Sequence, residues 1–312
     1  MSMAHGIGAS GHSNAAAVGL GADAVAEAVR GFHESGWCRF AYDPALAAWV
    51  EAVVPHAERI ASDPSAQAAW LRCGGTWFAG VNILPNDTLG GWADTATGAP
   101  AGTLPTVPAL SGTAIGFLRS VLGHEGLPLD AGQLSVCYPG YPAAPQPDES
   151  EAAFRFRRDR DAAHLDGLER DDARNRRLGE AHAFILGIPL APCGAEAAPF
   201  VIYEGSHRIM RDALLRRLAG IPVPDWPSED VTEAYVAARR RVFEACPRRL
   251  VVAAPGEAYL AHRLSIHGVG PWAGSEPQGS MAATSRPIVY FRPALPPDPN
   301  GEPDFEAWLT AP

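Results

Sequence analysis

The sequence contains no lysine, because all 25 of its basic residues are arginines. A Schiff-base lysine, a lysine-bound pyridoxal phosphate and the lysine of a P-loop are therefore excluded. Any anionic ligand must be held by arginine, backbone amides, hydroxyl groups or a metal ion. The net charge of −10 would repel a phosphate backbone, so we expect no nucleic-acid partner.

Long apolar runs are also lacking, and none approaches the roughly 20 residues of a membrane span. The first 20 residues hold no arginine and no sustained apolar block, which argues against a secretory signal and predicts a flexible tail. The five cysteines are scattered and form no C-x-x-C pair. Reduced thiols in a cytoplasmic protein fit this pattern better than disulfides or a zinc knuckle.

Helical patterns occupy the N-terminal part, whereas β patterns dominate from residue 133 onward. We expect a flexible tail at 1–20 and a single domain at 21–312, with a helical part at 21–130 and a β-barrel core at 131–295. The fold class is mainly β with flanking helices, as a barrel or a sandwich. The expected helices cover 22–35, 44–61, 110–122 and 229–245, and 73–109 reads as a loop.

Short β-type runs are separated by proline and glycine in this second part. They are QLSVCYP, AAFRFRRD, AHAFILGIPL, PFVIYEG, RRLVVAA, EAYLAHR and RPIVYFRP.

Ten histidines are present, and only His164 is followed two residues later by an aspartate, Asp166. Residues i and i+2 of a strand point to the same face, so this pair could hold one metal ion. His56 and Glu58 have the same spacing but lie in a helical pattern, where such residues diverge.

A third ligand should come from a histidine far along the chain, and the candidates are His182, His207, His262 and His267. His267 stands where a strand pattern meets Gly268, a natural position for a ligand at a strand end. His262 has the opposite strand parity and is expected to face away. The residues therefore favour His267.

Four segments together resemble the phytanoyl-CoA dioxygenase-like Fe(II)/2-oxoglutarate oxygenases, in the order of that family. They are AAHLDGL, PFVIYEGSHR, GEAYLAHRLSIHG and SRPIVYFRP, within 133–293. The resemblance implies a double-stranded β-helix (jelly-roll, cupin-like) barrel. It also implies that Fe(II), 2-oxoglutarate and O₂ are used to hydroxylate a small molecule, with succinate and CO₂ as coproducts.

Site residues follow from the same resemblance. His164, Asp166 and His267 correspond to the metal ligands, a set that suits non-haem iron. Arg286, at the start of the last strand, corresponds to the arginine that binds 2-oxoglutarate, because a guanidinium matches a carboxylate with two parallel hydrogen bonds. Arg292 has the same parity and is the alternative. Tyr138 corresponds to a second contact to 2-oxoglutarate.

The prediction of substrate-binding residues depends on strand parity. If 154–166 is one regular strand, Arg158 and Arg160 share the face of the metal ligands. They then either pair with local aspartates or bind an anionic group of the substrate.

Trp77 and His182 either line the pocket or belong to the core. Two other functions stay open at this point: a cupin-like metal enzyme that does not use 2-oxoglutarate, and a non-catalytic β-sandwich binding module.

Overall fold

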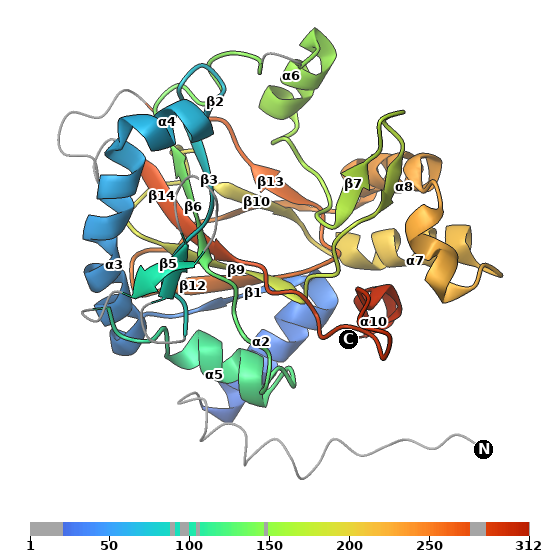
Figure 1. Cartoon of the computed structure of the whole chain (residues 1–312), viewed down its shortest axis with the longest axis horizontal. Coiled ribbons are helices and arrows are strands. Elements are labelled where there is room, and N and C mark those ends of the chain that lie inside the picture. Colours follow the sequence, from blue (N-terminus) through green and yellow to red (C-terminus); the bar gives the residue numbers. More distant parts are fainter. Residues whose placement is uncertain are drawn as a thin grey trace.

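The computed structural model describes residues 21–87, 91–93, 100–103, 107–146, 149–274 and 285–311 (Figure 1). The predicted tail at 1–20 lies outside the described residues. No helix of the described residues is both long enough and apolar enough to cross a membrane.

The elements of the first half are α2 (Ala22–Arg30), the π-helix η1 (Gly31–Ser35), β1 (Trp37–Phe40), α3 (Pro44–Ser62), α4 (Pro64–Trp70), β2 (Leu71–Arg72), β3 (Trp77–Leu84), β4 (Gly91–Ala93), β5 (Pro100–Thr103), α5 (Thr113–Ser120), β6 (Gly132–Cys137) and α6 (Glu151–Asp159). Those of the second half are β7 (Leu168–Arg170), β8 (Arg176–Leu178), β9 (Phe184–Pro189), β10 (Phe200–Tyr203), α7 (Ser206–Leu218), the 3₁₀-helix η2 (Val223–Ser228), α8 (Thr232–Ala245), β11 (Arg248–Val251), β12 (Ala258–His262), β13 (His267–Val269), β14 (Arg286–Phe291) and α10 (Phe305–Thr310).

Two antiparallel sheets form the centre of the molecule. The large sheet has the order β1-β12-β9-β14-β6-β3-β2, and the small sheet has the order β11-β10-β13. The pairs β6–β14, β9–β12 and β10–β11 are nested in sequence, each inside the one before. A bridge between His164 and His267 forms a further pair, which lies in this order between β6–β14 and β9–β12. Nested pairing of this kind, with the chain passing between two sheets, is the jelly-roll topology. The predicted fold class is therefore confirmed.

Apolar side chains from both sheets meet between them. Phe200 of the small sheet lies 4.9 Å from Tyr259 of the large sheet, measured between ring centroids, and Ile288 belongs to the same cluster. The opposite face of the large sheet is covered by α2, α3 and α5, whereas α7, α8 and α10 share a second core beside the small sheet (Figure 1).

Asp43 joins two of the covering helices. Its carboxylate accepts hydrogen bonds from Ala45 N at 2.8 Å, at the start of α3, and from Thr113 N at 2.7 Å, at the start of α5. One side chain thus satisfies amide groups that each helix start leaves without an intrahelical partner.

Several elements differ from expectation, among them α6, β3 and α7. Residues 152–159, predicted as a strand, belong to helix α6, because Ser150 Oγ caps the helix by accepting from Ala153 N at 3.2 Å. The expected loop at 73–109 contains β3, which pairs with β6 in the large sheet. Helix α7, which follows Gly205, was not expected; together with α8 it lies beside the β7–β8 hairpin in Figure 1.

Candidate metal centre

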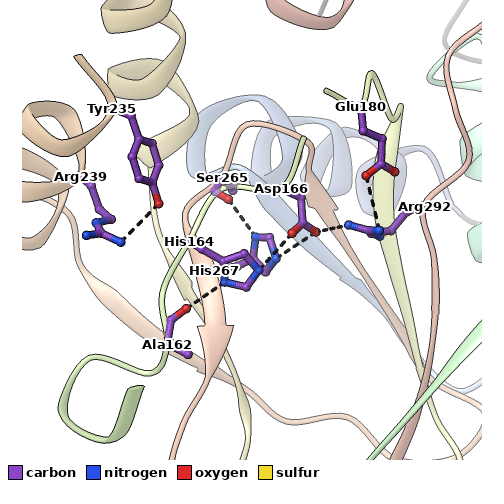
Figure 2. A network of polar contacts seen from close by, with 9 residues as sticks. All are labelled: Ala162, His164, Asp166, Glu180, Tyr235, Arg239, Ser265, His267 and Arg292. Carbon is purple, nitrogen blue, oxygen red and sulfur yellow. Dashed lines mark hydrogen bonds and ion pairs between the residues drawn. The ribbon is translucent and has the colours of Figure 1, made fainter. Parts of the chain in front are cut away.

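A β-bridge brings two histidines from distant segments side by side. His164 N donates to His267 O at 2.8 Å, and His267 N donates to His164 O at 3.1 Å. Asp166 follows two residues after His164, and ligand atoms of the three side chains lie within 4.8 Å of one another. In Figure 2 the three side chains point toward a common centre. Within the described ranges, this is the one group of His, Cys, Asp or Glu that could hold a metal ion.

Both imidazole rings are held in the same way. His164 Nδ1 lies 2.9 Å from the carbonyl oxygen of Ala162, and His267 Nδ1 lies 3.0 Å from that of Ser265. If each Nδ1–H donates to its carbonyl, each Nε2 faces Asp166, where a metal ion would take the place of the Nε2 proton. Phe200 stacks on His267, with ring planes 19° apart, and so fixes the second ring from behind. The tautomer that a metal ligand needs is thus set by the backbone.

Asp166 is surrounded by positive or polarised partners. Its carboxylate oxygens lie 3.0 Å from His164 Nε2 and 3.5 Å from His267 Nε2. Arg292 Nη1 lies 2.7 Å from Asp166 Oδ2, and Arg292 Nη2 lies 3.5 Å from Glu180 Oε2. Burial alone would raise the pKa of Asp166, but His267 and His164 hold that pKa well below its usual range. The carboxylate is therefore ionised at neutral pH, as a metal ligand must be.

Two cavities meet at this cluster. The inner cavity, of about 300 Å³, lies between the sheets and includes Ser135 and Tyr290 in its lining. The outer cleft, of about 680 Å³, also borders the cluster and is partly lined by Trp70 and Tyr141. His164 and Asp166 line both spaces. A metal ion at the cluster would therefore border both spaces.

Arg286 lies deep between the sheets, with only 3% of its surface exposed. Its Nη2 donates to the hydroxyl of Tyr290 at 3.3 Å, and this hydroxyl lies 3.2 Å from that of Tyr259. Its Nη1 is buried and has no hydrogen-bond partner among the residues that the structure describes. A buried cationic donor without a partner is costly and fits an anion that belongs next to it.

The other sequence-predicted residues are dispersed. Trp77 lines both the inner cavity and the outer cleft, and its Nε1 donates to Ser135 Oγ at 3.1 Å. Tyr138 packs against the core beneath the covering helices and lines neither space.

His182 is fully buried near Trp308, outside both spaces, and burial lowers its pKa to about 3. His262 Nδ1 accepts from Leu264 N at 3.0 Å, away from the cluster.

Arg158 and Arg160 do not share a face with the metal-binding cluster. The parity argument that joined them is wrong, because α6 is a helix and ends before His164. Arg158 is exposed and pairs with Asp159 at 2.8 Å, and Arg160 lies over the ring of Phe243. Neither lines the inner cavity or the outer cleft.

Sequence reasoning missed two residues, Tyr290 and Arg176, and the contact between Arg292 and Asp166. Tyr290 lines the inner cavity and shares strand parity with Arg286, so the pattern of β14 could have found it. The contact between Arg292 and Asp166 could not be read from parity alone. Arg176 lines the outer cleft from the β7–β8 hairpin, a segment whose position depends on the tertiary structure.

No protein-family model matches the chain, and no curated protein matches it either. Among solved structures, 216 chains match. One is HygX from Streptomyces hygroscopicus with nickel, 2-oxoglutarate and hygromycin B bound, at 15% identity over 85% of each chain and a TM-score of 0.43. Another is SnoK, a non-haem α-ketoglutarate-dependent carbocyclase from nogalamycin biosynthesis, at 13% identity over 86% of this chain and 83% of that chain, with a TM-score of 0.39.

EvdMO1 also matches, at 14% identity over 88% of this chain and a TM-score of 0.43, and the match spans half of that chain. At identities of 13–15%, the chemistry of this chain must be decided from its own residues.

Proposed function

We propose that this chain is an Fe(II)/2-oxoglutarate-dependent oxygenase of the phytanoyl-CoA dioxygenase-like kind that hydroxylates a small molecule. The observation that carries the proposal is the position of the His164–Asp166–His267 cluster between two compartments. One is the inner cavity, whose lining residue Tyr290 accepts a hydrogen bond from the buried guanidinium of Arg286, and the other is an open cleft large enough for a substrate.

The donor set suits iron. Two neutral imidazoles and one carboxylate on one side of an ion are the ligands that non-haem Fe(II) oxygenases use, with the opposite positions open. Arg292 would hold one oxygen of Asp166 while the other faces the metal, because its Nη1 contacts Oδ2 in the present arrangement. When bound, iron and the keto acid would supply O₂ activation and decarboxylation to succinate and CO₂, coupled to oxidation of a substrate C–H bond.

The inner cavity would take 2-oxoglutarate. Arg286 offers its unpartnered Nη1 to the distal carboxylate, and the Tyr290 hydroxyl, already 3.3 Å from Arg286 Nη2, would supply a second contact. A guanidinium stays charged even when buried, which suits it to this role better than any other side chain. Arg292 is engaged by two carboxylates, so we assign the keto acid to Arg286. Tyr138 has no part in this proposal, because its ring packs beneath the covering helices.

Anaerobic addition of Fe(II) and 2-oxoglutarate to the protein tests the proposal. A visible charge-transfer band should appear with both present and with neither alone, because it requires the keto acid to chelate the iron. The band should be lost in Asp166→Ala. Iron binding without the band would point to a cupin-like metal enzyme that does not use 2-oxoglutarate. The absence of iron binding would point to a binding module without catalysis.

A further inference from the structure

Four arginines line the outer cleft: Arg72, Arg157, Arg176 and Arg292. Two of them are paired with carboxylates, since Arg157 contacts Glu149 at 2.9 Å and Arg292 contacts Asp166 at 2.7 Å. Arg72 donates to the carbonyl oxygen of Leu71 beside it. Arg176 differs from these three arginines in the groups that surround its guanidinium.

Arg176 faces an aromatic ring and other cations. Its guanidinium lies 4.5 Å above the ring of Tyr235 in α8, and Arg239 lies 5.1 Å from the same ring. In the part of the chain that the structure describes, no carboxylate forms an ion pair with Arg176. Half-burial lowers the pKa of Arg176, and the positive charges of Arg170 and Arg239 lower it further. Because like charges surround this guanidinium, binding of an anion beside it would lower the electrostatic energy more than binding beside an arginine that is already paired with a carboxylate.

The rest of the outer cleft can hold the body of a ligand. Trp77 and Tyr141 form an aromatic wall, and their rings are 6.2 Å apart in an edge-on arrangement. Arg176 lines the same cleft as the exposed edge of His164, of whose side chain 45% is accessible. A ligand bound to Arg176 can therefore extend along the cleft toward the metal-binding cluster.

We propose that the substrate carries an anionic group, a carboxylate or a phosphate, that binds Arg176 and directs the rest of the molecule toward His164. This inference rests on the proposed function for the reaction, but the anion site itself does not depend on it. The planar guanidinium accommodates either anion with two hydrogen bonds, and the ring of Tyr235 holds it in place. Arg158 and Arg160 lie outside the cleft and take no part.

The test uses the full-length protein loaded anaerobically with Fe(II) and 2-oxoglutarate, and three aromatic probes: phenylacetate, phenyl phosphate and the neutral phenylacetamide. Calorimetric titration should show that at least one anion binds about tenfold more tightly than the amide. Arg176→Gln should remove that difference, and Arg176→Lys should restore part of it, since a positive charge remains. Arg158→Gln, an exposed arginine paired with Asp159, is the matched control and should change nothing.

Several results would overturn the inference. These are equal binding of the anions and the amide, no binding of either anion at millimolar concentrations, or an anion preference that survives in Arg176→Gln. A melting curve for each variant checks that the packing on Tyr235 is intact. The two anions separate a carboxylate from a phosphate preference.

The charge-transfer band of iron and 2-oxoglutarate keeps this test apart from the proposed function. If the band forms but the anion preference does not depend on Arg176, the anion site is wrong and the oxygenase stands. If the band never forms while Arg176 still selects anions, the oxygenase is wrong and the anion site stands.

Discussion

Arg292 Nη1 lies 2.7 Å from Asp166 Oδ2, so a residue just after the end of β14 holds the carboxylate of the metal-binding cluster. Partners of this kind orient metal ligands, and their loss typically lowers metal affinity about 10- to 100-fold. We expect Arg292→Gln to weaken Fe(II) binding by about this factor. A competition titration with a metallochromic chelator measures it. Arg39→Gln, which breaks the surface ion pair with Glu257, is the control, and an equal loss in both variants would contradict the assignment.

The three ligands should be indispensable for metal binding. His164→Ala, Asp166→Ala and His267→Ala each remove one of only three protein donors, so each is expected to abolish stoichiometric Fe(II) binding and turnover. His262→Ala should bind iron normally, because His262 Nδ1 accepts from the backbone and the ring lies against Phe32. Loss of iron in His262→Ala with retention in His267→Ala would reverse the choice of the distal ligand.

Binding of 2-oxoglutarate should depend on Arg286. A charge-assisted pair in a desolvated site contributes roughly 2–5 kcal/mol, so Arg286→Gln should raise the KM for 2-oxoglutarate by about 30-fold or more. Because Arg286 lies away from the ligands, the affinity for Fe(II) should stay within about twofold. Steady-state kinetics with varied 2-oxoglutarate measure the effect. If KM is unchanged here but rises strongly in Arg292→Gln, Arg292 is the keto-acid residue.

The sequence was most informative where one local pattern decided both structure and chemistry. The short spacing of His164 and Asp166 identified them correctly, although Asp166 lies in a turn and not in a strand. His267 opens β13, whereas His262 ends β12, so strand parity did not decide between these two histidines. The strands β9, β10, β12 and β14 were also predictable, because each is a short, mainly apolar run with proline or glycine near its ends.

Prediction failed where two local signals competed. The alternation in AAFRFRRD favours a strand, but Ser150 at the N-cap and Glu151 in the first turn favour a helix, and the helix forms. The outer cleft could not be predicted either. Arg176 lies in the β7–β8 hairpin and Trp77 lies in β3, about 100 residues earlier, and only the tertiary structure brings them to one cleft.

His207 should make the protein sensitive to acid. The side chain is 3% exposed, its ring lies 4.8 Å from that of His262, and Nε2 lies 3.1 Å from the carbonyl oxygen of His33. Burial lowers the pKa of His207 to about 4, with Arg208 and Arg211 acting in the same direction. His207 therefore binds a proton near pH 6.5 in the unfolded chain, but only near pH 4 in the folded chain.

The stability that neutral His207 provides is complete above pH 6.5 and declines as the pH falls toward 4, where the folded side chain also becomes protonated. His207→Gln keeps a donor for the His33 carbonyl but cannot titrate. Between pH 7.5 and 4.5, we expect wild type to lose about 2–3 kcal/mol more of its unfolding free energy than this variant. Urea denaturation at both pH values measures the difference. His56→Gln, at a partly exposed position on α3 where burial and Arg59 also lower the pKa, should differ from wild type less than His207→Gln does. Equal losses in wild type and His207→Gln would show that the pKa of His207 is not lowered in the folded state.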